Sequence, residues 1–330
     1  MKPRTRPFSR PPARGAALLL AMLLLVMVVT ITAGMVWQQA RAIEVEAAER
    51  ARSQSGWVIT GALDWARLIL REDGRSQQRS GRNLDSLDEP WATPLAEARL
   101  STFLAADQNN NTDTGPEAFL SGSIQDAQSR WNLRNLVDGA GKEVPAEKAA
   151  LLRLCQQAGL PGDTADLISV GLRQAWGPPA AEGNSAAPLA PQRLSELEWI
   201  GLAPATLRRL APWVELLPRP TPVNANTAPR EVLLVAIDGL DLGSAERLVQ
   251  ARQRKPFEGL DDIKAQLPPT MVIDPARVGV SSSFFQVNGR LRLDDRVLEE
   301  RSLLERRAPD RDSEVVVLRR ERIPAGVSPR

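Results

Sequence analysis

The sequence predicts an α+β protein that has an N-terminal transmembrane helix and an antiparallel sheet interrupted by a large all-α insert. Three observations support this fold class. The residues from Ala16 to Ala40 carry no charge, and ~20 apolar residues are enough for a helix to cross a bilayer. Polar and apolar residues alternate at 119–126 and again after residue 282, which is typical of strands. Between residues 146 and 276 the pattern is mostly helical instead.

Charges on either side of the apolar segment predict how it lies in the membrane. Lysine and arginine residues precede it without any acid, and Glu44, Glu46 and Glu49 follow it. Because basic flanks stay on the cytoplasmic side, we expect a single pass with the N-terminus in the cytoplasm. The chain beyond residue 40 is then expected outside the cytoplasmic membrane.

Three interpretations of this N-terminus are open from the residues alone: a signal peptide cut near Ala40-Arg41-Ala42, a plain signal anchor, and a leader of the prepilin type. A signal peptide has an apolar core of ~7–15 residues, which is shorter than the segment here. Arg14-Gly15-Ala16 resembles the junction at which the leaders of type IV pilins and pseudopilins end. The resemblance implies cleavage after Gly15 by the prepilin peptidase and methylation of Ala16.

The fifth residue after this junction is Leu20. Most pilins and pseudopilins carry a glutamate there, which in that family is thought to meet the charged N-terminus of the subunit already in the filament. A glutamate in hydrocarbon is costly and needs such a partner, whereas Leu20 does not. Lack of the glutamate is a feature of the K pseudopilins of type II secretion. The resemblance therefore implies a subunit that starts or caps a filament.

After the membrane segment, apolar residues at helical spacing extend the predicted helix to about Arg71. Glycines and prolines at 73–95 predict a loop, and Leu95–Ala105 is predicted to be a short helix. The first strand is expected at Phe119–Asp126, where the side chains alternate.

The segment Trp131–Leu136 resembles a signature of the K pseudopilins, with Arg134 in place of one asparagine. Asparagine side chains bond their own backbone, so we expect turns in which the asparagines have a structural role. The elements predicted after it are helices at Ala146–Ala158 and Thr164–Trp176, a loop at 177–193 and two short helices within Leu194–Leu217.

A helix–hairpin–helix pattern follows, in which Asn224–Ala228 precedes helices at Pro229–Ile237 and Ser244–Arg252. It resembles units of exported DNA receptors, so a membrane-anchored periplasmic DNA-binding protein is the alternative function. Such units hold phosphates with hairpin amides and basic residues. Here Asp238 and Asp241 lie in the hairpin and would repel phosphate, so we expect no nucleic acid partner. The K pseudopilins have a similar arrangement in their SAM-like helical domain.

The end of the chain is predicted to return to strands. Ser282–Val287 and Arg290–Leu293 flank Asn288-Gly289, a strong signal for a two-residue hairpin. Further strands are expected at Arg296–Glu305 and Ser313–Glu321. The predicted domains are a leader at 1–15, a transmembrane helix at 16–40, the first part of a pilin-like domain at 41–145, the helical insert at 146–276, and returning strands with a C-terminal tail at 277–330.

Composition argues against catalysis. The sequence contains no histidine, which removes the commonest general base and the commonest metal ligand. Cys155 is the one cysteine, so an internal disulfide is impossible, and its leucine neighbours predict a buried thiol. A site of two paired carboxylates is the enzymatic arrangement that sequence spacing leaves open. We expect a protein that is not an enzyme.

One segment has the spacing of a calcium loop. Asp107, Asn109, Asn111 and Asp113 offer oxygen ligands at every second position. Ala118 stands where a calcium loop of this kind has its final glutamate, so a plain polar loop is the competing interpretation. Pseudopilins often use calcium to fix loops, and the resemblance supports the site. We expect no other cofactor.

The resemblance as a whole implies a minor pseudopilin of the K class in the bacterial inner membrane, with most of the chain in the periplasm. Its expected role is to initiate the type II secretion pseudopilus and to cap it for protein export. The expected partners are the minor pseudopilins I and J, together with H, the prepilin peptidase and the exported proteins.

Overall fold

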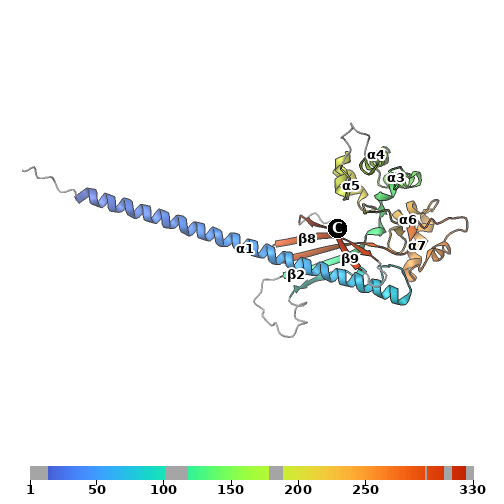
Figure 1. The fold of residues 1–330 in the computed structure, drawn as a ribbon, viewed down its shortest axis with the longest axis horizontal. Helices are drawn as coiled ribbons and strands as arrows, with labels where there is room; N and C mark the ends of the chain where they lie inside the picture. The colour runs from blue at the N-terminus through green and yellow to red at the C-terminus, as the bar shows by residue number, and fades with distance from the viewer. Residues whose placement is uncertain (1–13, 101–117, 178–188, 294–295, 308–313, 325–330) are drawn as a thin grey trace, which may run out of the picture. The chain divides into compact units, whose positions relative to one another are not determined.

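The computed structural model of the chain describes residues 14–100, 118–177, 189–293, 296–307 and 314–324. Its longest element is α1 (Arg14–Ser80), a single helix of 67 residues (Figure 1). The chain forms two structural units, which meet within this helix between Trp57 and Val58.

The first unit consists of helix α1 up to Trp57. Its most apolar stretch has no buried residue, and it is long and apolar enough to cross a membrane. Leucine, valine and methionine side chains therefore cover the surface of an isolated helix, which is stable only in lipid or against other chains.

The second unit contains a five-stranded antiparallel sheet with the strand order β1-β2-β7-β8-β9. Its strands are β1 (Leu95–Arg99), β2 (Ala118–Asp126), β7 (Phe284–Leu293), β8 (Arg296–Arg307) and β9 (Glu314–Ile323). The first two strands precede the helical insert and the other three follow it. β2 and β7 pair along their length although about 160 residues separate them, with Gly122 opposite Gly289.

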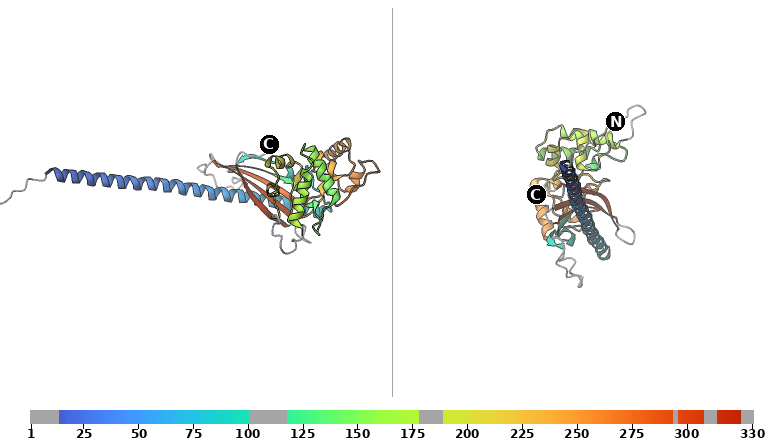
Figure 2. Two further views of the ribbon diagram at one scale, coloured as in Figure 1. Left: turned by 90° about the horizontal axis from the view of Figure 1, so that it is seen from above. Right: turned by 90° about the vertical axis from the view of Figure 1, so that its left-hand side faces the viewer.

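The last part of α1 packs on one face of this sheet, as the two views of Figure 2 illustrate. Leu63, Ala66 and Leu70 project from the helix into a cluster with Phe285 and Leu304 of the sheet. Trp91 closes the cluster, and its ring meets that of Phe285 edge-on at 5.3 Å between centroids. Buried apolar area of this kind supplies most of the free energy that holds a helix on a sheet.

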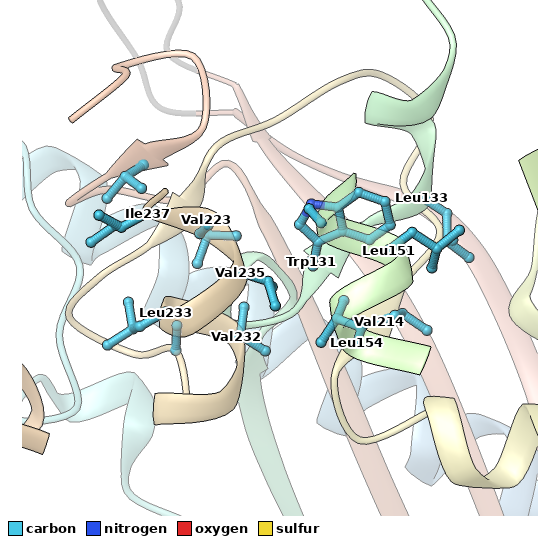
Figure 3. Packing of buried hydrophobic residues seen from close by; sticks show 14 of the residues in the cluster. Trp131, Leu133, Leu151, Leu154, Val214, Val223, Val232, Leu233, Val235 and Ile237 are labelled. Atoms are coloured by element: carbon cyan, nitrogen blue, oxygen red, sulfur yellow. The ribbon is translucent and has the colours of Figure 1, made fainter. Parts of the chain in front are cut away.

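The helical insert has a core of its own. Its elements are η2 (Ala127–Ser129), β3 (Trp131–Asn132), η3 (Leu133–Leu136), α3 (Pro145–Gln157), α4 (Thr164–Trp176), η4 (Leu194–Ile200), α5 (Pro204–Leu210), β4 (Val214–Glu215), β5 (Val223–Asn224), α6 (Arg230–Ala236), α7 (Leu242–Arg254), α8 (Leu260–Lys264) and β6 (Val278–Gly279). Figure 3 shows part of the core, in which side chains of β3, α3 and β4 meet those of β5 and α6.

Three local predictions were wrong. Leu95–Arg99 is a strand rather than a helix, because β1 pairs with β2 and tertiary pairing overrides the helix propensity of leucine, alanine and glutamate. Asn288-Gly289 is not a turn but lies in the middle of β7. Helix α1 runs past Arg71 to Ser80 and ends at Gly81, whose φ of 68° is the left-handed conformation that stops helices.

Other local predictions were confirmed. Phe119–Asp126 lies within β2, and the two insert helices predicted first correspond to α3 and α4. The last two strands correspond to β8 and β9, although Ser313 lies outside the described residues. A short 3-10 helix, η1 (Pro90–Ala92), interrupts the loop predicted before β1.

Candidate assembly surfaces

The N-terminal candidate residues lie within one helix. α1 begins at Arg14, so Gly15 and Ala16 are part of its first turn, whereas the sequence predicted that the helix starts only after Gly15. Leu20 lies one turn further on and is 63% exposed. The surface around it is apolar, and no other described segment of the chain covers it.

An aromatic residue marks the end of the apolar surface of α1. Trp37 is 65% exposed, and the guanidinium of Arg41 lies 5.5 Å from the centre of its ring. Tryptophan beside arginine is typical of the boundary between a membrane and water. The segment from Ala16 to Trp37 therefore fits the hydrocarbon layer.

A second apolar surface lies where α1 meets the edge of the sheet in the second unit. A groove of about 260 Å³ is lined by Ile59, Trp65 and Ile69 of the helix and by Trp91 and Leu95 beside it. Trp65 is 49% exposed. Exposed aromatic surface around an apolar groove is typical of sites at which proteins bind one another.

A buried arginine joins α1 to the sheet. Arg306 of β8 donates hydrogen bonds to Asp73 at 2.6 Å and to both oxygens of Asp85, at 2.5 and 2.7 Å. Asp85 is fully buried. Carboxylate oxygens of Asp73, Asp85 and Glu89 lie within 4.8 Å of one another, and the single guanidinium of Arg306 is hydrogen-bonded to two of these carboxylates. The cluster therefore acts as a structural clamp.

Too few positive charges lie near this clamp to keep every carboxyl ionised. Burial raises the pKa of Asp73 to about 6 even though Arg306 opposes the shift. Burial likewise raises the pKa of Glu89 to about 7, and Asp73 and Asp85 add repulsion. The folded protein therefore holds protons that an exposed carboxyl would release.

A second buried network joins the sheet to the helical insert. The Asp126 carboxylate, at the end of β2, accepts hydrogen bonds from Thr227 at 2.5 Å, from Ser282 at 2.7 Å and from Asn224 at 2.9 Å. Burial raises the pKa of Asp126 to about 6, because these neutral donors only partly replace water. Asn224 also donates to the backbone carbonyl of Asp85, so the two networks are connected.

The asparagine motifs have structural roles, as predicted. Asn226 bonds the backbone of Phe257 in both directions, through its side-chain nitrogen at 3.0 Å and its oxygen at 2.8 Å. Asn132 accepts from the backbone amides of Arg134 and Leu217. Asn135 bonds the backbone of Thr221 in both directions. Backbone groups of the same chain therefore take up the hydrogen-bonding capacity of these side chains.

The helix–hairpin–helix unit is closed to phosphate. Asp241 caps α7 by accepting from the backbone amide of Ser244 at 2.8 Å, at the position where a DNA-binding unit would receive a phosphate. Asp238 accepts from Arg153 at 2.8 Å and from Arg277 at 2.7 Å. Arg252 points inward and donates to two backbone carbonyls at 2.6 Å. The geometry favours a packing unit over a DNA-binding one.

Two further candidates have different outcomes. Asp107, Asn109, Asn111 and Asp113 lie outside the described residues, so their calcium site stays a prediction. Cys155 is buried, as predicted, and burial raises the pKa of its thiol to about 11. A thiol in this environment is a poor nucleophile.

Sequence reasoning missed the clamp around Arg306. Asp73 and Asp85 are more than 200 residues away from Arg306 in the chain, and nothing in local spacing pairs them. The one available signal was Arg306 itself, which directly follows the strand predicted at Arg296–Glu305.

Comparisons with known proteins agree with this architecture. Residues 223–281 match the family model described as type II secretion system, protein K. The chain is 29% identical over 300 residues to the type II secretion system protein K of Pseudomonas aeruginosa, covering 86% of this chain and 85% of that protein. It is 28% identical over 321 residues to the protein K of Pectobacterium carotovorum, covering 88% of this chain and 92% of the other.

A solved structure has the same fold. It is the crystal structure of the GspK-GspI-GspJ complex from the type 2 secretion system of enterotoxigenic Escherichia coli, one chain of which superposes with a TM-score of 0.59 at 19% identity. The match covers 84% of this chain and 99% of that one. The chain is thus similar over most of its length to the protein K of type II secretion systems, and its residues 223–281 match the model of that family.

Proposed function

We propose that this chain is the tip subunit of the type II secretion pseudopilus, where it initiates assembly with other minor pseudopilins and caps the filament. The proposal rests on one observation: residue 20 is a leucine and not a glutamate. A subunit without an acid at this position has nothing to pair with the N-terminus of a subunit ahead of it, so it fits the first place in a stack of helices. The rest of its exposed apolar helix is available to the subunits that follow.

The helical insert supports the capping role. It adds a complete folded core, α3 to α8, to a sheet that already covers the end of α1. Such bulk leaves no room for another subunit above it. The protein acts through assembly, and its contribution to export is mechanical rather than catalytic.

The partners we propose are the minor pseudopilins I and J, with H next in the filament. The related crystal structure is of a complex named GspK-GspI-GspJ, and both apolar surfaces of α1 described above are suited to packing against similar helices. Co-purification of the full-length chain with I and J from detergent-solubilised membranes tests this. Recovery of the chain with neither pseudopilin would refute the proposal.

A matched pair of variants tests the role of Leu20. Leu20→Glu and Leu24→Glu each place an acid on the exposed apolar surface of α1, where a carboxylate in hydrocarbon is costly. Only Leu20→Glu restores the pilin pattern, so we expect only this variant to be incorporated at internal positions of filaments. If both variants were incorporated at internal positions equally often, the residue at position 20 would not decide where the subunit sits in the filament.

We also propose the membrane topology and the processing of the chain. The N-terminus lies in the cytoplasm, α1 crosses the inner membrane once, and the second unit lies in the periplasm. The prepilin peptidase cuts between Gly15 and Ala16. Mass spectrometry of the mature protein should find a methylated N-terminal Ala16, whereas a start at Ile43 would indicate a secreted soluble protein.

A calcium site at Asp107, Asn109, Asn111 and Asp113 is a further proposal, supported by the spacing of their oxygen ligands. Calorimetric titration of the full-length chain with calcium should detect a site that Asp107→Asn and Asp113→Asn weaken. Unchanged binding in the double variant would place the calcium elsewhere.

A further inference from the structure

The sheet has a polar face turned away from α1. Successive side chains of a strand point to opposite faces, and Phe285 and Val287 of β7 pack with α1. Gln286, Asn288 and Arg290 therefore point the other way. At one end of this face Phe284 and Leu303 pack against Ala127 and Leu217. The remainder of the face is polar.

A groove follows this polar face. It has a volume of about 680 Å³ and lies between the sheet and α5, where Arg208, Ala211 and Pro212 form the opposite wall. Pockets of ~300–1,000 Å³ are the size that encloses small ligands and the side chains of short segments. Serine, glutamine and asparagine side chains of β2 and β7 line its floor and offer hydrogen bonds in both directions.

The groove carries an excess of positive charge. Four guanidinium groups line it, those of Arg130, Arg208, Arg290 and Arg301, against the carboxylates of Glu299 and Glu300. The net formal charge of these six groups is +2. Arginine in this number on a polar floor is typical of sites that bind carboxylates or phosphates.

The four guanidinium groups differ in whether a nearby carboxylate balances their positive charge. Arg130 is bound to Glu215 at 2.9 Å, and Arg290 lies 3.5 Å from Glu299. Among the described residues, Arg301 donates to the Asn288 side chain, at 3.3 Å.

Glu300 does not compensate these groups, because it is bound to Arg320 at 2.8 Å. Within the described part of the chain, Arg208 is exposed and forms no ion pair. Two guanidinium groups, those of Arg208 and Arg301, are therefore available to an incoming anion.

The geometry points to a docking groove for an acidic, extended polypeptide segment, supplied by an exported protein. Arg208 and Arg301 stand on opposite walls and can each take one carboxylate, as separate acidic side chains along a peptide would present them. The amide and hydroxyl side chains of the floor match peptide N–H and C=O groups between those carboxylates.

The choice of an exported protein rests on the proposed function. Neighbouring pseudopilins pack along α1, on the other face of the sheet, so the polar groove remains free in a subunit at the tip. A tip subunit is also the one that an exported protein meets first. Charge steering by the exposed arginines would speed such an encounter.

Fluorescence anisotropy with a defined probe tests the groove on the full-length chain in detergent. The probe is a labelled peptide of alternating glutamate and serine, compared with a peptide that has glutamine for glutamate and with a short DNA duplex. We expect the glutamate peptide to bind, the glutamine peptide to bind at least about 10-fold more weakly, and affinity to fall with salt. Tighter binding of the duplex, or no binding of the glutamate peptide, would overturn the proposal.

Adjacent arginines of α5 provide a matched control. Arg208→Ala combined with Arg301→Ala should weaken the glutamate peptide about 10-fold or more. Arg209→Ala removes the same charge from the same helix outside the groove and should leave affinity within about 2-fold. Equal losses in both variants would mean that binding follows net charge and not the groove.

Co-purification and export measured in cells separate the docking groove from the proposed function. A chain with Arg208→Glu should still co-purify with I and J while export of acidic proteins falls. Loss of I and J in that variant would make the groove an assembly surface and overturn the inference. Failure of the unmodified chain to bind I and J would instead count against the proposed function, and peptide binding would be unaffected by it.

Discussion

At the scale of single residues, Arg306 has the largest structural role that the sequence did not predict. It compensates Asp73 and Asp85 inside the protein, and removing one partner of a buried ion pair leaves an uncompensated charge. We expect Arg306→Ala to lower the free energy of unfolding by ~3–5 kcal/mol, measured by urea unfolding of the solubilised chain.

The neighbouring Arg307 is the control for this prediction. It is exposed and pairs with Glu305 at 2.9 Å, and exposed pairs contribute ~0–1 kcal/mol. Arg307→Ala should therefore be close to neutral. A similar loss in both variants would mean that the clamp does not hold α1 on the sheet.

The raised carboxyl pKa values predict how stability changes with pH. Asp73 and Asp126 have a pKa of about 6 and Glu89 of about 7 in the folded protein, above their ordinary values near 4. The folded state thus binds more protons than the unfolded state between about pH 4 and pH 7. The stability that these groups contribute is complete below about pH 4 and is lost as pH rises through 6 to 7.

Asp126 is the most direct test of this pH dependence of stability, because its side chain is buried. A pKa raised from 3.8 to about 6 corresponds to roughly 3 kcal/mol. Urea unfolding between pH 4.5 and 7.5 should give a free energy that falls with pH, and Asp126→Asn should flatten the slope. A stability that rises through this range would contradict the assignment.

At the scale of elements, the pairing of β2 with β7 depends on a glycine in β2. A Cβ atom on Gly122 would lie 2.8 Å from the backbone carbonyl oxygen of Asn288, and neither strand can move without breaking the ladder. We expect Gly122→Ala to destabilise the protein by ~1–3 kcal/mol, the range for overpacking. Gly139→Ala, where a Cβ meets nothing within 4 Å, is the control in the same unfolding measurement. Equal effects would show that the close approach has no cost.

The same pairing explains which elements could be predicted from the sequence. Helices α3 and α4 were found because the spacing of their apolar residues is a local signal. Leu95–Arg99 was missed because its strand exists only through pairing with β2. Asn288-Gly289 was interpreted as a turn, but both residues pair with β2 in the middle of the sheet, with Gly289 opposite Gly122. Gly74 suggested an end to α1 that the chain reaches only at Gly81.

At the scale of the whole molecule, the sequence predicted the order of the parts correctly: an apolar helix, a strand, a helical insert and returning strands. It predicted this because each part has its own composition and period. It could not predict the polar groove or the buried networks, since these join residues that are far apart in the chain. The anchor helix was the first element that the sequence predicted. Among the described residues, nothing buries its most apolar stretch.

A tip subunit should occupy one end of the filament and no internal position. Immunogold labelling of pseudopili with an antibody against the helical insert, viewed by electron microscopy, tests it most directly. We expect gold at one end of each filament. Gold distributed along the filament would contradict it.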